Sequence, residues 1–166
     1  DSFTISENVT NVGTLTATDG DGDTLSFSIS GTDASLLTVG SSSGVLTLNT
    51  ASDYETKQSY ALTASVSDGN STVNQNITIS VIDTVEAPTF SSASSFTVNE
   101  NQTSIGTLQA TDPQNDTLTS SSSGTDASSM NVNSSTGALT FNAAPDYETK
   151  TSYSITATAS DGTNST

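Results

Sequence analysis

The stretch DYETKQSY at residues 53–60 returns as DYETKTSY at residues 146–153, an offset of 93 residues. Each copy places an Asp and a Glu one residue apart, in a chain otherwise rich in Ser, Thr and small residues. Acids at positions i and i+2 project to the same side of an extended backbone, because side-chain direction in a strand has a period of two. Such acids repel each other unless a cation lies between them, and the chain holds only two basic residues. We therefore interpret them as ligands of a Ca²⁺ ion.

The same offset organises the whole chain into two repeats. No insertion is needed to align Glu7-Asn8 with Glu100-Asn101, Thr18-Asp19 with Thr111-Asp112, residues 31–35 with 124–128, and residues 67–69 with 160–162. A unit of 93 residues has the size of a small β-sandwich domain and is too long for a solenoid repeat. We predict two domains, residues 1–85 and 86–166, joined by an acidic linker that contains Pro88.

Alternation of apolar and polar residues predicts the strands of the first repeat. It runs through residues 14–18, 25–29, 60–67 and 77–81, and turn signals such as Asp68-Gly69 separate these segments. A period of two is typical of half-buried antiparallel strands, and about seven strands in a unit indicate an immunoglobulin-like sandwich.

The second repeat is expected to be the less stable one. Ser120 and Ser122 replace Phe27 and Ile29, which forfeits about 3–6 kcal/mol of apolar burial. The counterpart of residues 72–81 is also missing, so we expect the second sandwich to lack its last strand. Two explanations stay open: truncation of the chain, or donation of that strand by a neighbouring chain.

A net charge of −16, with no His and no Cys, narrows the classes of function. Nucleic acid is not an expected partner, because there is no basic surface to release its counterions. Oxygen ligands without His or Cys point to Ca²⁺ and away from zinc or copper. We expect no enzyme and no catalytic residues, since the chain has no His, no Cys and no Gly-rich phosphate loop, and Ca²⁺ explains its carboxylate clusters better. No apolar run reaches the length of a membrane-spanning helix.

The ordered motifs resemble the cadherin repeat, in the version found in large bacterial surface proteins and adhesins. The resemblance rests on Glu7, Ala-Thr-Asp-x-Asp at 17–21, Asp-Tyr-Glu at 53–55, Ser-Asp-Gly at 67–69 and the acidic Ala-Pro linker at 81–90. It covers all of the first repeat and all but the last strand of the second. It implies an all-β fold of two tandem immunoglobulin-like, cadherin-type Greek-key β-sandwiches. It also implies an extracellular or cell-surface location.

The resemblance further implies Ca²⁺ ions shared between successive domains. Carried over by position, the ligands at the junction would be Glu7, Asp53, Glu55, Asp83, Glu86, Asp112 and Asp161. A half-site towards a preceding domain would use Asp19, Asp21 and Asp68, and one towards a following domain would use Glu100, Asp146 and Glu148. The second repeat departs from the family at Gln114, where a second Asp is usual, and Asp116 is the candidate substitute. We expect one or two ions at this junction.

The leading interpretation is a structural module, stiffened by Ca²⁺, that extends an adhesin or filament from a cell surface. Its partners would be neighbouring repeats of the same chain or like subunits. The alternatives are a filament subunit that polymerises by strand donation and a module that binds a carbohydrate or another cell-surface protein. Lys57 and Lys150 are expected to be solvated beside Glu55 and Glu148, with an isopeptide bond to a nearby Asn or Asp as the alternative.

Overall fold

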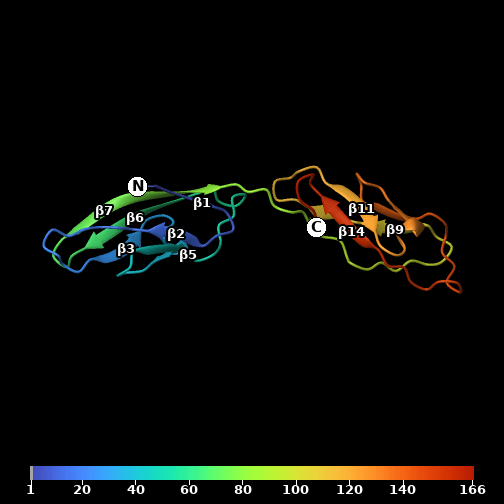
Figure 1. Ribbon diagram of the computed structural model, residues 1–166, viewed down its shortest axis with the longest axis horizontal. Helices are drawn as coiled ribbons and strands as arrows, with labels where there is room; N and C mark the ends of the chain where they lie inside the picture. The colour runs from blue at the N-terminus through green and yellow to red at the C-terminus, as the bar shows by residue number, and fades with distance from the viewer. Residues whose placement is uncertain (1) are drawn as a thin grey trace. The chain divides into compact units, whose positions relative to one another are not determined.

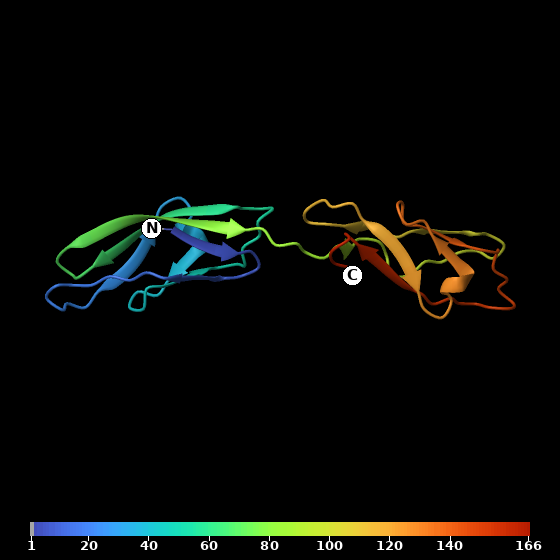
Figure 2. The ribbon, with the colours of Figure 1, turned by 45° about the horizontal axis from the view of Figure 1, so that its top comes forward.

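The computed structural model describes residues 2–166, and the chain divides into unit 1 (Asp1–Thr84) and unit 2 (Val85–Thr166). Each unit is built from strands (Figure 1, Figure 2), with one short 3₁₀ turn apiece, η1 (Ala34–Leu36) and η2 (Ala127–Ser129). Within the described part of the chain, no helix is long and apolar enough to cross a membrane. The described residues form strands and two 3₁₀ turns, so the all-β prediction is confirmed.

Unit 1 is a sandwich of two sheets. The strands are β1 (Ser2–Ser6), β2 (Asn11–Thr14), β3 (Ser26–Ser30), β4 (Leu37–Val39), β5 (Val45–Leu48), β6 (Ser59–Ser67) and β7 (Thr72–Ile82). One sheet has the order β1-β7-β6-β3 and the other the order β2-β5-β4. Every neighbouring pair is antiparallel except β1 and β7, which run parallel. The seven strands match the number expected from the sequence.

The hairpin of β6 and β7 supplies much of the core of unit 1. Across this ladder Tyr60 lies opposite Ile79 and Leu62 lies opposite Ile77, and none of the four side chains is more than 7% exposed. Their alternation with Ser, Thr and Ala turns one face of each strand inwards, as the period-two pattern predicts. On the other side of β7, Phe3 of β1 pairs beside Ile79.

One predicted strand is wrong. The alternation at residues 14–18 indicated a strand, but β2 ends at Thr14. Its partner β5 begins only at Val45, so beyond Thr14 the chain faces a turn that offers no ladder of hydrogen bonds. Beyond Thr14, the Leu15 N–H donates to the Gly44 carbonyl at 2.8 Å. Gly44 has a φ of +66°, and a Cβ would lie 2.2 Å from the Leu15 oxygen, so only glycine fits this turn.

Unit 2 repeats part of this plan. Its strands are β8 (Thr89–Phe90), β9 (Ser104–Thr107), β10 (Ala110–Thr111), β11 (Thr119–Ser123), β12 (Met130–Val132), β13 (Ala138–Phe141) and β14 (Thr156–Ser160). They form a three-stranded sheet β12-β13-β9 and two pairs, β11 with β14 and β8 with β10. Strand β14 is shorter than the corresponding β6.

The core of unit 2 is much thinner than that of unit 1. Among the described residues, ten hydrophobic side chains are buried in unit 1, whereas unit 2 buries Leu108, Leu139 and Ala159. Ser120 and Ser122 pair with alanines across the β11–β14 ladder, where β3 and β6 pair Phe27 with Val66 and Ile29 with Ala64. This confirms that β11 contributes little to its core.

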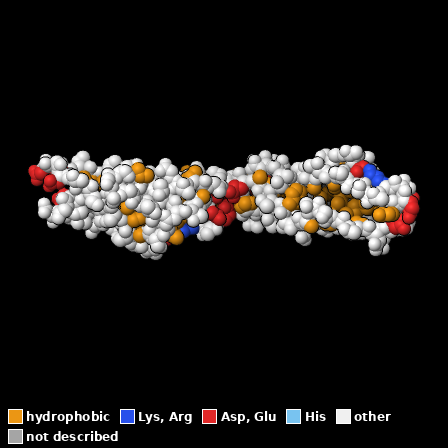
Figure 3. All heavy atoms as spheres, turned by 90° about the horizontal axis from the view of Figure 1, so that it is seen from below, with side chains coloured by type: hydrophobic (Ala, Val, Ile, Leu, Met, Phe, Trp, Pro, Cys, Tyr) orange, Lys and Arg blue, Asp and Glu red, His pale blue; other side chains and the backbone are white. Residues whose placement is uncertain are grey.

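An open apolar groove marks the position that β7 occupies in unit 1. In unit 1, β7 lies between β1 and β6. Within the described part of unit 2, β14 has a single strand partner, β11, and residues 95–99, which correspond to β1, are not a strand. The groove encloses about 560 Å³ and is lined by side chains such as Phe96, Leu139 and Tyr153. Figure 3 shows hydrophobic side chains gathered on this face of unit 2.

Filling the core of unit 2 should stabilise it. We expect Ser120→Phe with Ser122→Ile to raise the free energy of unfolding of unit 2 by about 1–3 kcal/mol, less than full burial would give because the groove is open. Urea unfolding of the 166-residue chain should show the less stable of two transitions move upwards while the other stays. Ser121→Phe is the matched control, because Ser121 is exposed on the opposite face of β11. No shift in the double variant would contradict the prediction.

Candidate metal centre

Three carboxylates gather at one end of unit 1. Glu7, Glu55 and Asp83 each offer an oxygen, and these oxygens lie within 4.8 Å of one another. Glu7 follows β1 and Asp83 follows β7, and these two strands run parallel in register, with Ser6 beside Ile82. Parallel neighbours end at the same edge of a sheet, so the two acids leave it side by side. The sequence predicted all three residues as ligands.

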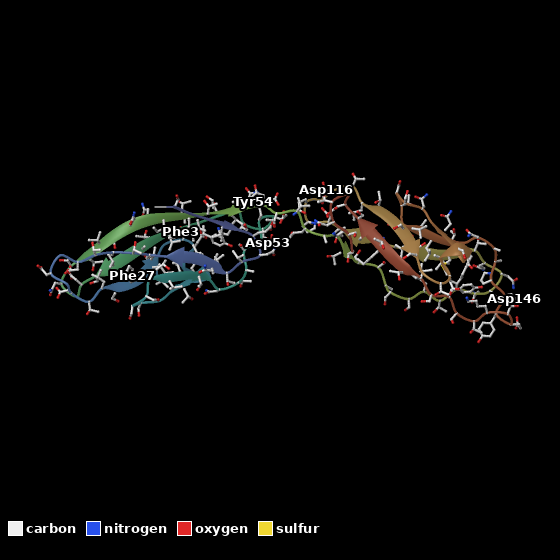
Figure 4. The ribbon with its side chains drawn as sticks, viewed as in Figure 1. Phe3, Phe27, Asp53, Tyr54, Asp116 and Asp146 are labelled. Atoms are coloured by element: carbon white, nitrogen blue, oxygen red, sulfur yellow. The ribbon has the colours of Figure 1, made fainter. Side chains whose placement is uncertain are left out.

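The third carboxylate arrives on a loop before β6. β6 is antiparallel to β7 and begins with Ser59 opposite Ser80, so the loop lies at the edge where β7 ends. Figure 4 shows Asp53 and Tyr54 of this loop at that end of unit 1. The oxygens of Asp53 accept hydrogen bonds from the N–H and the hydroxyl of Thr56, at 3.0 and 2.9 Å. These bonds fold the loop into a turn before Lys57, whose N–H donates to the Asp53 carbonyl at 2.8 Å.

Glu7 is the buried member of the group, only 3% exposed. Its Oε2 accepts a hydrogen bond from the Tyr54 N–H at 3.1 Å. Its Oε1 accepts two from Thr84, from the N–H at 2.6 Å and the hydroxyl at 3.0 Å. Burial raises the pKa of Glu7, but the hydrogen bonds from Tyr54 and Thr84 outweigh it and hold the pKa below its ordinary value. Glu7 is therefore an ionised buried carboxylate that ties the loop and the end of unit 1 together.

A corresponding group lies in unit 2. Glu100, Asp146 and Glu148 each offer an oxygen, and these oxygens also lie within 4.8 Å of one another. The tie is the same as in unit 1, because the Tyr147 N–H donates to Glu100 Oε2 at 3.2 Å. All three acids are exposed, in contrast to Glu7. A hydrogen bond from the Thr149 hydroxyl is the main reason why the pKa of Asp146 lies below its ordinary value.

Two carboxylates at the other end of unit 2 have an oxygen without a partner. Asp112 Oδ2 and Asp161 Oδ2 are buried and accept no hydrogen bond. The other oxygen of each is satisfied by backbone, Asp112 Oδ1 by the Asp116 N–H and Asp161 Oδ1 by the N–H groups of Thr163 and Asn164. A buried anionic oxygen without a partner is costly, and a bound cation removes that cost. These two acids therefore fit a hard cation with oxygen ligands.

The remaining predicted ligands do not join a group of three among the described residues. They are Asp19, Asp21, Asp68, Asp53, Glu86, Asp112, Asp116 and Asp161. Several cap their own turns instead: Asp19 Oδ1 accepts from the Asp21 N–H at 2.9 Å, and Asp68 Oδ1 accepts from the Ser71 N–H at 2.6 Å. The hydrogen bonds of Asp68, first from Ser71 and then from Asn70, lower its pKa. Figure 4 shows Asp116 and Asp146 at opposite ends of unit 2.

The linker residue Glu86 is held within unit 2 by an amide side chain. Its N–H donates to Gln114 Oε1 at 3.3 Å. One residue earlier, the Val85 carbonyl accepts from Asn164 Nδ2 at 3.1 Å. Gln114, which the sequence marked as a departure from the expected Asp, thus orients the backbone of the linker.

Sequence reasoning missed the role of the lysines. They were expected to be solvated beside Glu55 and Glu148, but each pairs with a nearly buried aspartate in its own unit, Lys57 with Asp33 and Lys150 with Asp126. A hydrogen bond from the Ala61 N–H, followed by the pairing with Lys57, holds the pKa of Asp33 below its ordinary value. Lys150 is the main cause of the lowered pKa of Asp126. The signal was present, because Asp33 and Lys57 recur together at the same offset.

A protein-family model for the cadherin domain matches residues 1–85 and again residues 94–166. The chain belongs to the cadherin family. This family is non-enzymatic, and cadherin repeats are extracellular domains of cell-surface proteins that typically bind Ca²⁺ between domains. The expectation of a non-enzymatic protein is thereby confirmed.

This cadherin chain is similar in sequence to short parts of very large cadherin-related proteins. It is 37% identical over 108 residues to the Fat-like cadherin-related tumor suppressor homolog of Drosophila melanogaster, covering 61% of the chain and 2% of that protein. It is 33% identical over 147 residues to human protocadherin Fat 4, covering 81% of the chain and 3% of that protein. The chain thus spans only a few hundredths of the length of these relatives.

Solved cadherin structures share the fold. Human protocadherin-24 EC1-2 (Form II) matches with a TM-score of 0.61 and 24% identity, over 95% of this chain and 81% of that one. Drosophila N-cadherin EC1-4 matches with a TM-score of 0.57 and 20% identity, over 99% of this chain and 45% of that one. Identities this low speak for the fold alone, and they confirm two cadherin-type sandwiches.

Glu7→Gln should reveal the contribution of the buried carboxylate to stability. In metal-free protein at neutral pH we expect unit 1 to lose about 1.5–3 kcal/mol, the range for hydrogen bonds to a charged group. Because the folded pKa of Glu7 is lowered from 4.5, its stabilisation is fully present above pH 4.5 and is lost as the pH falls through the folded value. Urea unfolding with chelator between pH 7 and pH 3 should therefore show a smaller loss of stability in the variant. Glu100→Gln, at the exposed equivalent, should change little at any pH.

Proposed function

We propose that the chain is a pair of Ca²⁺-binding cadherin repeats that extend a cell-surface adhesion protein. The observation that carries this proposal is the convergence of Glu7, Glu55 and Asp83 at the end of unit 1. These side chains supply oxygen ligands only. Ca²⁺ takes about six to eight oxygens in irregular geometry and is served well by Asp and Glu, whereas Mg²⁺ demands a stricter octahedron and keeps more of its water.

Electrostatic repulsion gives the cation its effect. Two carboxylates about 5 Å apart repel by roughly 1–3 kcal/mol for effective dielectric constants between water and a protein surface. Three such acids without a cation oppose one another, and a shared cation converts the repulsion into attraction. Asp83 lies one residue before the end of unit 1 and Glu86 one residue after the start of unit 2. Ligands on both sides of so short a stretch would restrain it when they bind a common ion.

The remaining predicted acids complete the proposal. Asp112 and Asp161 would supply their unpartnered oxygens to the ion at this junction, with Asp53 and Asp116 as further candidates. Asp19, Asp21 and Asp68 would face a preceding domain, and Glu100, Asp146 and Glu148 a following one. The domains themselves would comprise residues 1–85 and 86–166. The narrower assignment to bacterial surface proteins rests on the sequence resemblance alone.

Calorimetry with metal-stripped protein tests the proposal. We expect CaCl₂ to bind in the micromolar to millimolar range, and MgCl₂ to bind more weakly. Glu55→Gln with Asp83→Asn should weaken binding at least about tenfold, because the site loses two charged ligands. Asp23→Asn is the matched control, since it removes an acid that belongs to neither group of three.

Small-angle scattering supplies the second arm. With Ca²⁺ we expect a narrower distribution of interatomic distances than with chelator, and the Glu55→Gln, Asp83→Asn variant should resemble the chelated wild type under both conditions. Identical scattering of the wild type with and without Ca²⁺ would contradict a stiffening role. If calorimetry showed no heat of binding up to millimolar Ca²⁺, the site itself would be contradicted.

A second candidate function is assembly by strand donation, favoured by the groove in unit 2. The strand that fills the equivalent position in unit 1 has a clear pattern, with Ile77, Ile79 and Val81 buried and their neighbours exposed. A like subunit that offers such a strand would bury those side chains against the groove. A synthetic peptide with the sequence of residues 72–82 should then bind the chain, whereas the same peptide with Ile77→Ser and Ile79→Ser should not. Equal binding of both peptides would remove this candidate.

A further inference from the structure

The only two basic residues of the chain occupy the same place in each unit. Lys57 Nζ lies 3.0 Å from Asp33 Oδ1, and Lys150 pairs with Asp126 in the same way. The aspartate side chains are only 11% and 12% exposed, whereas the lysines keep 35% and 42% of their exposure. With 18 acids and two lysines in the chain, chance pairing would favour exposed acids. Both lysines instead select the aspartate that is nearly buried.

Each aspartate is fixed to the backbone, Asp33 at Ala61 of β6 and Asp126 at Ser154, two residues before β14. Asp33 Oδ2 accepts from the Ala61 N–H at 2.7 Å, and the Asp33 N–H donates to the Ala61 carbonyl at 3.2 Å. Asp126 makes the same two bonds with Ser154, at 2.7 and 3.2 Å. An aspartate held by two backbone hydrogen bonds cannot follow a moving lysine. The aspartate is therefore the fixed point of the pair and the lysine is the part that it restrains.

The lysine is the last residue of a short turn that carries the acids, residues 53–57 in unit 1 and 146–150 in unit 2, which we call the acidic turn. The Lys57 N–H closes the turn on the Asp53 carbonyl at 2.8 Å, and the Lys150 N–H closes its turn on Asp146 at 2.9 Å. The Lys57 ammonium also lies 5.2 Å from the centre of the Tyr60 ring, a cation–π distance. The turn is thus held at both ends, by Glu7 at its Tyr54 N–H and by Asp33 at Lys57.

We propose that the Asp33–Lys57 and Asp126–Lys150 pairs are positioning residues that keep each acidic turn at the edge of its sheet, so that its carboxylates stay converged before a cation binds. Without this anchor, repulsion from Glu7 and Asp83 would drive Glu55 outwards, and a cation would have to pull the turn back. A lysine alone near the site would repel a cation. Its partner aspartate cancels that charge, so the pair contributes geometry and adds no net charge.

This inference rests on the proposed function, and a charge-balanced variant separates position from charge. Asp33→Asn with Lys57→Met removes one negative and one positive charge, so the net charge stays the same. We expect the Ca²⁺ affinity of the site formed by Glu7, Glu55 and Asp83 to fall about tenfold, as measured by calorimetry on the 166-residue chain. Lys57→Arg, which keeps the charge and reaches the aspartate, should stay within about twofold of the wild type. Unchanged affinity in the double variant would overturn the proposal.

Hydrogen exchange in chelator provides a readout that needs no metal. In the double variant we expect the amides of residues 54–57 to exchange at least about tenfold faster, while those of Ile77 and Ile79 keep their rates. Uniformly faster exchange through unit 1 would mean a general structural role and would overturn the proposal, as would no change. Should the double variant fail to fold, Lys57→Gln, which leaves the backbone bonds of Asp33 intact, carries the same expectations.

The second unit supplies the matched control. Asp126→Asn with Lys150→Met should accelerate exchange at residues 147–150 and leave residues 54–57 at the wild-type rate. The wild type could bind no Ca²⁺ while residues 54–57 still exchange faster in the Asp33→Asn, Lys57→Met variant. That result would contradict the proposed function and leave the anchoring role standing. The two failures are therefore distinguishable.

Discussion

The parallel pairing of β1 with β7 is the constraint on which the acidic end of unit 1 depends. The two strands are far apart in sequence, yet their register places Ser6 beside Ile82, so the next residue of each, Glu7 and Asp83, leaves the sheet at the same edge. β6 begins at that edge because it is antiparallel to β7, and the loop before it brings Glu55. Three carboxylates therefore converge through the topology of the sheet.

The same pairing positions backbone groups that offset the cost of burying the charge of Glu7. A carboxylate removed from water is costly unless hydrogen bonds replace its hydration. The backbone around Glu7 supplies them, since the Tyr54 and Thr84 N–H groups both point at it. Neither donor belongs to a strand ladder. A side chain thus satisfies two backbone groups that the sheet leaves free, and it joins the acidic turn to the segment after β7.

The sequence predicted most of the fold, because half-buried strands leave a period-two pattern. The alternation in β3, β6 and β7 was sufficient to find them, and the serines at 120 and 122 correctly indicated a poor core in unit 2. The pattern failed at residues 15–18, where alternation continues but the partner strand has not yet begun. Local periodicity cannot show where a distant partner starts, so strand ends escape it.

The site was predictable in part for a similar reason. Repetition at a fixed offset marked Glu7 and Glu55, and the resemblance to the cadherin repeat added Asp83 of the linker. The convergence of the three follows from strand order. Repetition marked both Asp33 and Lys57 but could not show that they pair, because the pairing depends on the tertiary fold, which holds Asp33 against Ala61 of β6. Composition suggested solvated lysines, and tertiary contacts overrode it.

Among the described residues of unit 2, no pair of strands corresponds to β1 and β7. Residues 95–99 form no strand there, and Glu100 is exposed where Glu7 is buried. Even so, Glu100, Asp146 and Glu148 still converge, the Tyr147 N–H still donates to Glu100, and Lys150 still pairs with Asp126. The acidic turn therefore owes its shape to its own closure and to the ties at its two ends. In unit 1 the pairing of β1 with β7 also buries Glu7 and brings Asp83 close. The sheet therefore adds a carboxylate to the acids that the turn already holds together, and it removes Glu7 from water.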